Sequence, residues 1–190
     1  MAEIIDYSGE FVTNLNLEHL EHNTLAETAR LYTKLLYGLD GIWYKRIREI
    51  VGDEKGLACD QAVWDDFIRY EVVMIKRQFK IRGNDLVAYL KVTQLCPWFQ
   101  LTNSIIQLEG KTRATITVTS CPILESLESK EEVSEANRTC TLVCPRITET
   151  AARIINPNIE VSASKLPPRQ SKSDVCCQWD FELKSKYKRI

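Results

Sequence analysis

Four cysteines in the C-terminal half are the residues whose type and spacing most resemble a chemical site: Cys121, Cys140, Cys144 and Cys177. Four thiolates can complete the tetrahedral shell that Zn²⁺ prefers, with Zn–S distances of about 2.3 Å. Cys140 and Cys144 are spaced to share one face at the start of a predicted helix. That position also lowers a thiol pKa and favours the thiolate. The sequence therefore predicts a zinc site, with iron as the alternative metal.

Strand alternation selects which of two adjacent cysteines joins this cluster. In the last predicted strand, Cys177, Trp179 and Phe181 share one face, and the opposite face is mostly polar. Cys177 is therefore expected to point inward, and Cys176 to point to solvent. Inert packing of small apolar thiols is the alternative for the whole cluster.

Core packing is also the interpretation for the two cysteines of the helical half, Cys59 and Cys96. Two acids in that half interrupt apolar helix faces, namely Glu71 and Asp40. A carboxyl in such surroundings has a raised pKa and can act as a general base. A half-exposed helix carboxylate is the alternative for each of them.

Aromatic residues supply the candidate walls of a pocket for a flat or apolar ligand. The residues in question are Trp43, Trp64, Trp98 and Phe99. Ordinary core packing is the alternative for most of these side chains. The two histidines precede the first long predicted helix, and no Ser-His-Asp arrangement or phosphate-binding glycine loop is present in the sequence.

The composition is typical of a single soluble globular domain, with 190 residues and a net charge of −1. This charge gives no long-range attraction for nucleic acid or for an anionic membrane. No apolar stretch approaches the roughly 20 residues that span a bilayer. The acidic start of the chain is unlike a secretory leader, so we expect a cytoplasmic protein with reduced thiols. A small molecule is the expected partner, and a homodimer is compatible with the sequence.

The pattern of apolar residues changes from helical to extended near residue 104. Helices are predicted over 24–52, 61–80, 85–95 and 142–155, with Thr24, Asp60 and Asn84 as caps of the first three. Strands are predicted over 104–109, 112–120, 159–165 and 175–183. The acidic segment 125–137 is expected to form a surface loop or a loose helix. The predicted fold is an α+β domain in which N-terminal helices pack on a four-stranded antiparallel sheet.

The same pattern divides the single expected domain into consecutive parts. They are an N-terminal extension (1–23), a helical half (24–100), a sheet and cysteine-rich half (101–184) and a basic tail (185–190). The first long helix is expected to bury an apolar face that includes Leu36, Leu39, Trp43 and Ile50.

Short motifs follow one another in a fixed order over roughly residues 35–183. They are Asp40-Gly-Ile-Trp43, Trp64 with Glu71, Pro97-Trp98-Phe99, Cys121-Pro122, Cys140-x3-Cys144 and Cys177-Gln-Trp179-Asp-Phe181. This series resembles an uncharacterised bacterial and archaeal family. That family is similar to aminothiazoline-carboxylate hydrolases and, more distantly, to the vinyl-reductase sensor domain.

The resemblance implies a fold like that of the vinyl-reductase domain, which in turn is similar to a subunit of the TRAPP trafficking complex. It also implies that Cys121, Cys140, Cys144 and Cys177 hold zinc beside a pocket for an aromatic ligand. Three functions stay open. The first is a hydrolytic metalloprotein acting on a small sulfur- or nitrogen-containing metabolite. The second is a non-catalytic binding module with a structural zinc, and the third is metal-free thiol chemistry.

Overall fold

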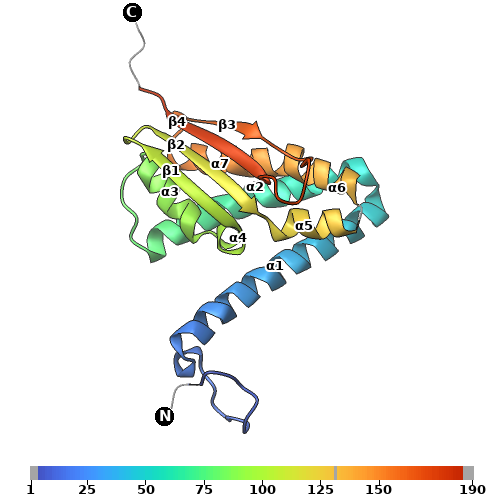
Figure 1. The fold of residues 1–190 in the computed structure, drawn as a ribbon, viewed down its shortest axis with the longest axis vertical. Helices are drawn as coiled ribbons and strands as arrows, with labels where there is room; N and C mark the ends of the chain where they lie inside the picture. The colour runs from blue at the N-terminus through green and yellow to red at the C-terminus, as the bar shows by residue number, and fades with distance from the viewer. Residues whose placement is uncertain (1–3, 131, 186–190) are drawn as a thin grey trace, which may run out of the picture.

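The computed structural model describes residues 4–130 and 132–185. Helices and strands are combined in an α+β fold with one antiparallel sheet, as the sequence predicts (Figure 1). The predictions for the first three residues and for most of the 185–190 tail fall outside the described part. No helix within the described ranges is long and apolar enough to cross a membrane.

Two long helices, α1 (His22–Val51) and α2 (Asp53–Gln78), form a hairpin that turns at Gly52. Gly52 has φ 86°, a conformation that glycine adopts without a steric penalty, and it ends α1 as the sequence predicts. The predicted start of α1 at Thr24 is slightly wrong, because the Glu21 side chain caps the helix by accepting from Asn23 and Thr24.

The predicted start of α2 is wrong by more. Asp53 and Glu54 occupy its first turn, where negative charge is favourable, and Asp60 lies inside the helix instead of capping it. Helices α1 and α2 approach each other closely at Gly56, where an added Cβ would lie 2.5 Å from the Cγ of Arg48. The absence of a side chain at residue 56 therefore allows the two helices to meet there.

Two shorter helices, α3 (Leu86–Leu95) and α4 (Pro97–Leu101), lead into the sheet. Asp85, and not the predicted Asn84, caps α3 by accepting from the Ala88 backbone N–H at 2.8 Å. Pro97 ends the predicted helix and also begins α4, where its missing N–H costs nothing.

The sheet consists of β1 (Asn103–Glu109), β2 (Arg113–Ser120), β3 (Ile159–Lys165) and β4 (Cys177–Leu183) in the order β1-β2-β4-β3. All neighbouring pairs are antiparallel, which confirms the predicted sheet. The register of β2 and β4 places Val118 opposite Cys177 and Ile116 opposite Trp179. The last strand therefore aligns the predicted inward thiol with the buried face of β2.

The connection between β2 and β3 is helical. It contains α5 (Pro122–Ser129), α6 (Val133–Arg138), a π-helical turn (Thr139–Val143) and α7 (Cys144–Ile155). The acidic segment predicted as a surface loop or loose helix thus contributes to two short helices. Cys140 lies in the π-helical turn and Cys144 is the first residue of α7, so the pair spans a change of helical geometry.

The hydrophobic core lies between one face of the sheet and the helices α2, α3 and α7. These helices lie behind the strands in the view of Figure 1. Tyr89 of α3 and Phe181 of β4 pack at the centre, with ring centroids 5.0 Å apart. Ile116 is 1 % exposed beside them. This arrangement confirms the predicted inward face of the last strand.

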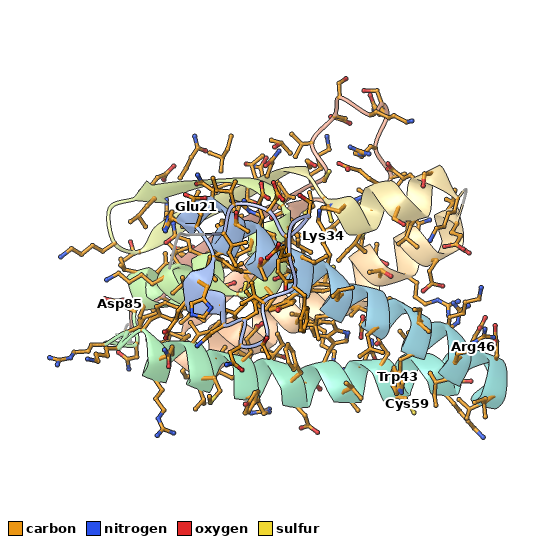
Figure 2. All side chains as sticks on the ribbon, turned by 90° about the horizontal axis from the view of Figure 1, so that it is seen from below. Glu21, Lys34, Trp43, Arg46, Cys59 and Asp85 are labelled. Atoms are coloured by element: carbon orange, nitrogen blue, oxygen red, sulfur yellow. The ribbon has the colours of Figure 1, made fainter. Side chains whose placement is uncertain are left out.

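Helix α1 departs from the predicted packing because none of its residues is fully buried. Its N-terminal part extends away from the body of the protein (Figure 1), and Figure 2 shows it running from Glu21 to the closed end of the hairpin near Arg46. Leu39 and Ile50 of the predicted buried face are 66 % and 77 % exposed. The prediction that this face packs inward is wrong, because α1 turns Tyr37, Asp40 and Tyr44 toward the body instead.

Three cysteines lie outside the predicted cluster, two of them expected in the core and Cys176 expected to face solvent. Cys96 is buried, and its thiol lies 2.8 Å from the Thr93 carbonyl, as expected for core packing. Cys59 is exposed on α2, so its prediction is wrong. Cys176 is 1 % exposed rather than solvent-facing. It precedes β4, where its backbone N–H donates to Val118 and its thiol approaches the Thr119 carbonyl at 3.6 Å.

Candidate functional site

A cavity of about 770 Å³ opens between α1 and the body of the protein. Its walls come from both halves of the chain, including α1, α2, α4, β2, the helices between β2 and β3, and β4. Five aromatic side chains line it: Tyr37, Tyr44, Trp64, Trp98 and Trp179. Tyr37 of α1 stacks on Trp64 of α2, with ring centroids 6.0 Å apart and an interplanar angle of 21°.

Two acids from the helical hairpin, Asp40 and Asp60, also line this cavity. Burial raises the pKa of Asp40 to about 6 because it penalises the carboxylate form. Burial raises the pKa of Asp60 to about 7, and the negative charges of Asp40 and Glu135 add to that effect. Asp60 is only 4 % exposed. The two acids are therefore partly protonated near neutral pH and close enough to influence each other.

Sequence reasoning misses Asp60 because it assigns that residue to a helix cap. In the observed helix, Asp60 is on the same face as Trp64, Ile68 and Glu71, at steps of three and four residues. A helix that begins at Asp53 would have placed it on the buried stripe. Tyr37 is missed because the chosen apolar face of α1 excludes it.

An ion-pair network lies at the edge of the cavity. Arg48 pairs with Glu135 of α6 and, at 2.8 Å, with Asp53, and Arg138 approaches Asp53 at 3.6 Å. The second carboxylate oxygen of Glu135 is buried and has no hydrogen-bond partner among the described residues. Arg48 therefore links the hairpin to α6 and balances a carboxylate that lies near Asp60.

Three of the four predicted thiols reach the wall of this cavity: Cys121, Cys144 and Cys177. Cys140 is not part of the wall, but its thiol interacts with that of Cys144. The indole N–H of Trp179 donates to the Cys177 sulfur at 3.2 Å. The structure thus brings together sulfurs from the end of β2, the start of α7 and the start of β4.

Burial and interactions among the thiols shift their pKa values. Burial raises the pKa of Cys121 to about 11 and that of Cys177 to about 12. The pKa of Cys144 is raised by its interaction with Cys140 first and then by burial, with smaller contributions from Cys121 and Cys177. The same interaction lowers the pKa of Cys140. Cys140 is the one member of the quartet whose pKa shift favours a nucleophilic thiolate.

The donor chemistry of the quartet suits zinc, since thiolates are its preferred ligands in closed four-coordinate sites. Within residues 4–130 and 132–185, however, no three His, Cys, Asp or Glu side chains are arranged to hold a metal ion as they stand.

The remaining predicted site residues do not line the cavity. Glu71 is 8 % exposed on α2 and influences the buried Tyr37 and Cys96, but it is not part of the wall. Burial raises its pKa to about 7. Phe99 packs against the core and meets Trp98 edge-on at 5.5 Å. Trp43 is on the outer side of α1 and is 37 % exposed.

Comparison with known proteins gives one match. A family model described as "Family of unknown function (DUF6125)" matches residues 18–183. No curated protein and no solved structure matches the chain significantly. The predicted resemblance to hydrolases and to the vinyl-reductase domain therefore stays a prediction.

Proposed function

The chain belongs to the DUF6125 family of unknown function, and from that starting point we propose that it binds a small aromatic ligand carrying a cationic nitrogen. The observation that carries the proposal is the cavity itself, in which aromatic walls surround the acids Asp40 and Asp60. Its volume of about 770 Å³ is within the range of small-molecule sites.

The charge of the ligand follows from the acids. An ionised carboxylate inside an apolar cavity is costly, and that cost is the main reason why the pKa values of Asp40 and Asp60 are raised. A bound cation offsets the cost because it offers the carboxylate an opposite charge. The faces of the surrounding rings attract the same cation through their quadrupoles. Three cations are also on the wall, namely Lys45, Arg48 and Lys130. The two lysines are exposed, and Arg48 is already paired with Glu135 and Asp53.

A hydrolytic activity, which the sequence also suggests, would have to use a base other than Glu71. Asp40 and Asp60 are two of the four acids on the wall, and their raised pKa values suit proton transfer near neutral pH. Binding of a nitrogen-containing ligand is common to both functions, so we propose binding first.

Calorimetric titration with three probes tests the ligand class. Tryptamine carries an aromatic ring and a cation, indole lacks the charge, and indole-3-acetate reverses it. We expect tryptamine to bind at least about tenfold more tightly than indole, and indole-3-acetate to bind most weakly. The preference for tryptamine should increase as the pH rises through about 7, because Asp60 then ionises.

The matched variants are Asp60→Asn, which removes the charge inside the cavity, and Asp66→Asn, which removes an exposed charge from the same helix. Asp60→Asn should abolish the preference for tryptamine over indole, while Asp66→Asn should leave it unchanged. Absence of binding by all three probes, or an unchanged preference in Asp60→Asn, would contradict the proposal.

A structural zinc held by Cys121, Cys140, Cys144 and Cys177 is a second proposal. It is supported by the mutual influence of these thiols and by the hydrogen bond from Trp179 to the Cys177 sulfur. Such outer hydrogen bonds orient the ligands of metal sites. When bound, zinc would tie the start of α7 to the ends of β2 and β4. The protein residues would then shape a closed site that leaves no position for substrate.

Elemental analysis of protein purified under reducing conditions tests this second proposal. We expect about one zinc per chain in the wild type and a loss of most of it in Cys144→Ser. Cys59→Ser is the control, because Cys59 is exposed and outside the quartet. A metal-free wild-type protein that also fails to take up added Zn²⁺ would exclude the site.

A further inference from the structure

Helix α1 carries a continuous apolar surface whose side chains are all exposed to a substantial degree in the described chain. Its members, named here the α1 arc, are exposed by 37 % to 66 % and comprise Leu25, Leu31, Tyr32, Leu35, Leu36, Leu39, Ile42 and Trp43. With 3.6 residues per turn, they fall within a sector of about 140°. No charged residue lies in that sector between Leu25 and Trp43.

The area of the α1 arc is that of a protein interface. A large apolar side chain has on the order of 150–200 Å² of accessible surface when free. At their exposed fractions, the eight members present roughly 700 Å² together, which exceeds the largest apolar patch of a typical monomer and approaches the ~800 Å² that each partner buries in a stable complex. A helix with this much exposed apolar surface is expected to have a partner.

We propose that the α1 arc is the interface with a second copy of this chain, packed antiparallel about a two-fold axis near Leu36. A two-fold interface must be complementary to itself. Leu31, Leu35 and Leu39 follow one another at four-residue steps, and such a ridge can pack against the same ridge of an identical helix. The partner thus needs no surface that this chain does not already have.

The charges along one edge of the α1 arc fit the same arrangement. Glu27 and Lys45 are on the same side of α1, and both are exposed. Antiparallel pairing about Leu36 brings Glu27 of one copy to the partner's Lys45, and the two-fold axis repeats the contact. Within the described residues neither side chain is part of an ion pair in the single chain. Parallel pairing would instead place Glu27 and Lys45 at different heights along the pair and would not bring them together.

Sedimentation velocity and light scattering of the full chain test the proposal. We expect a particle with twice the 21.9 kDa mass of one chain. Leu35→Glu should reduce the mass to that of a single chain, because it introduces two charges near the two-fold axis. Leu35 is 60 % exposed, so the helix should still fold, which circular dichroism checks. Ile105→Glu on β1 is the matched control, since Ile105 is 56 % exposed outside the arc and should leave the dimer intact.

Charge reversal tests the antiparallel orientation. Glu27→Lys should weaken dimerisation by about tenfold. Combining Glu27→Lys with Lys45→Glu should restore dimerisation, because opposite charges then meet again across the interface. A wild-type protein that is monomeric at about 100 μM overturns the proposal. So does equal disruption by Ile105→Glu and Leu35→Glu. A monomer that sediments with phosphatidylcholine–phosphatidylglycerol vesicles would assign the arc to a membrane surface instead.

Discussion

Glu71→Gln is expected to stabilise the protein by roughly 2–3 kcal/mol at about pH 8 and to leave it almost unchanged at about pH 4. Glu71 is 8 % exposed, and no hydrogen bond to its carboxyl group is present among the described residues. Burial raises its pKa from 4.5 to about 7. Glutamine has the shape of the protonated acid but never ionises, so it removes only the cost of the buried charge.

The sign of this stability change follows from the pKa values of Glu71 in the unfolded and the folded chain. Below pH 4.5 the carboxyl is protonated in both the folded and the unfolded chain, so its ionisation does not affect stability. As the pH rises toward about 7, the unfolded chain ionises while the folded chain stays protonated, and the folded state loses stability. Above that range the penalty is constant. Asp40 and Asp60 contribute in the same direction, so the difference between wild type and Glu71→Gln isolates the effect of Glu71.

Urea unfolding at a series of pH values measures this difference. Glu109→Gln is the control, because Glu109 is exposed at the end of β1. Its unfolding free energy should stay within about 0.5 kcal/mol of wild type at every pH. If the unfolding free energy of Glu71→Gln instead falls below that of wild type as the pH rises, the folded protein stabilises the carboxylate. That result would return Glu71 to the list of functional candidates.

Arg48→Met is expected to destabilise the protein by about 2–3 kcal/mol. The Arg48 and Glu135 side chains are 24 % and 16 % exposed, so their ion pair is largely shielded from solvent. Removing the guanidinium leaves a shielded carboxylate near Asp60, and one of its oxygens already lacks a partner among the described residues. Partial hydration keeps the cost below that of a fully buried pair.

A double-mutant cycle separates the interaction energy of the Arg48–Glu135 pair from the effects of the two single substitutions. Arg48→Met combined with Glu135→Leu should recover more than half of the loss, because the stranded charge is then gone. Arg46→Met is the matched control on the same helix. The Arg46 side chain is 70 % exposed in its pair with Glu49, so its loss should cost less than about 0.5 kcal/mol. Equal costs for the two arginine variants would show that the Arg48 pair is no more valuable than a surface contact.

Local patterns predict the sheet half of the fold well. The β-branched run of β2 and the alternation in β4 determine which side chains face the helices, and the observed register places Ile116 opposite Trp179 as those faces require. A strand is periodic over two residues, so few alternatives are compatible with one buried face. Cys177 was selected by this rule. The same rule predicts that Cys176 faces solvent, which is wrong, because Cys176 precedes the strand and its thiol is buried near the Thr119 carbonyl.

Helix α1 shows why the other half is harder to predict. Its apolar residues indicate an amphipathic helix, but the pattern does not say which body its apolar face contacts. Leu39 is exposed, whereas the polar and aromatic Tyr37 and Asp40 line a cavity. The sequence signal for the site was weak for the same reason. The residues that line a ligand cavity interrupt the regular apolar pattern. Their role depends on contacts with elements far along the chain, which a local pattern does not contain.

The cavity draws its walls from residues as distant in sequence as Tyr37 and Trp179, and this has a thermodynamic consequence. The unfolded chain has no such enclosure, so an occupant binds only the native state and shifts the folding equilibrium by mass action. At one hundred times its dissociation constant, a ligand adds about 2.7 kcal/mol to the unfolding free energy. Hydrogen exchange should then slow in the slowest amides of α2, α7 and β2 alike, since they open only when the whole chain unfolds. A compound could therefore be recognised as a ligand of this protein by its effect on elements that it does not touch.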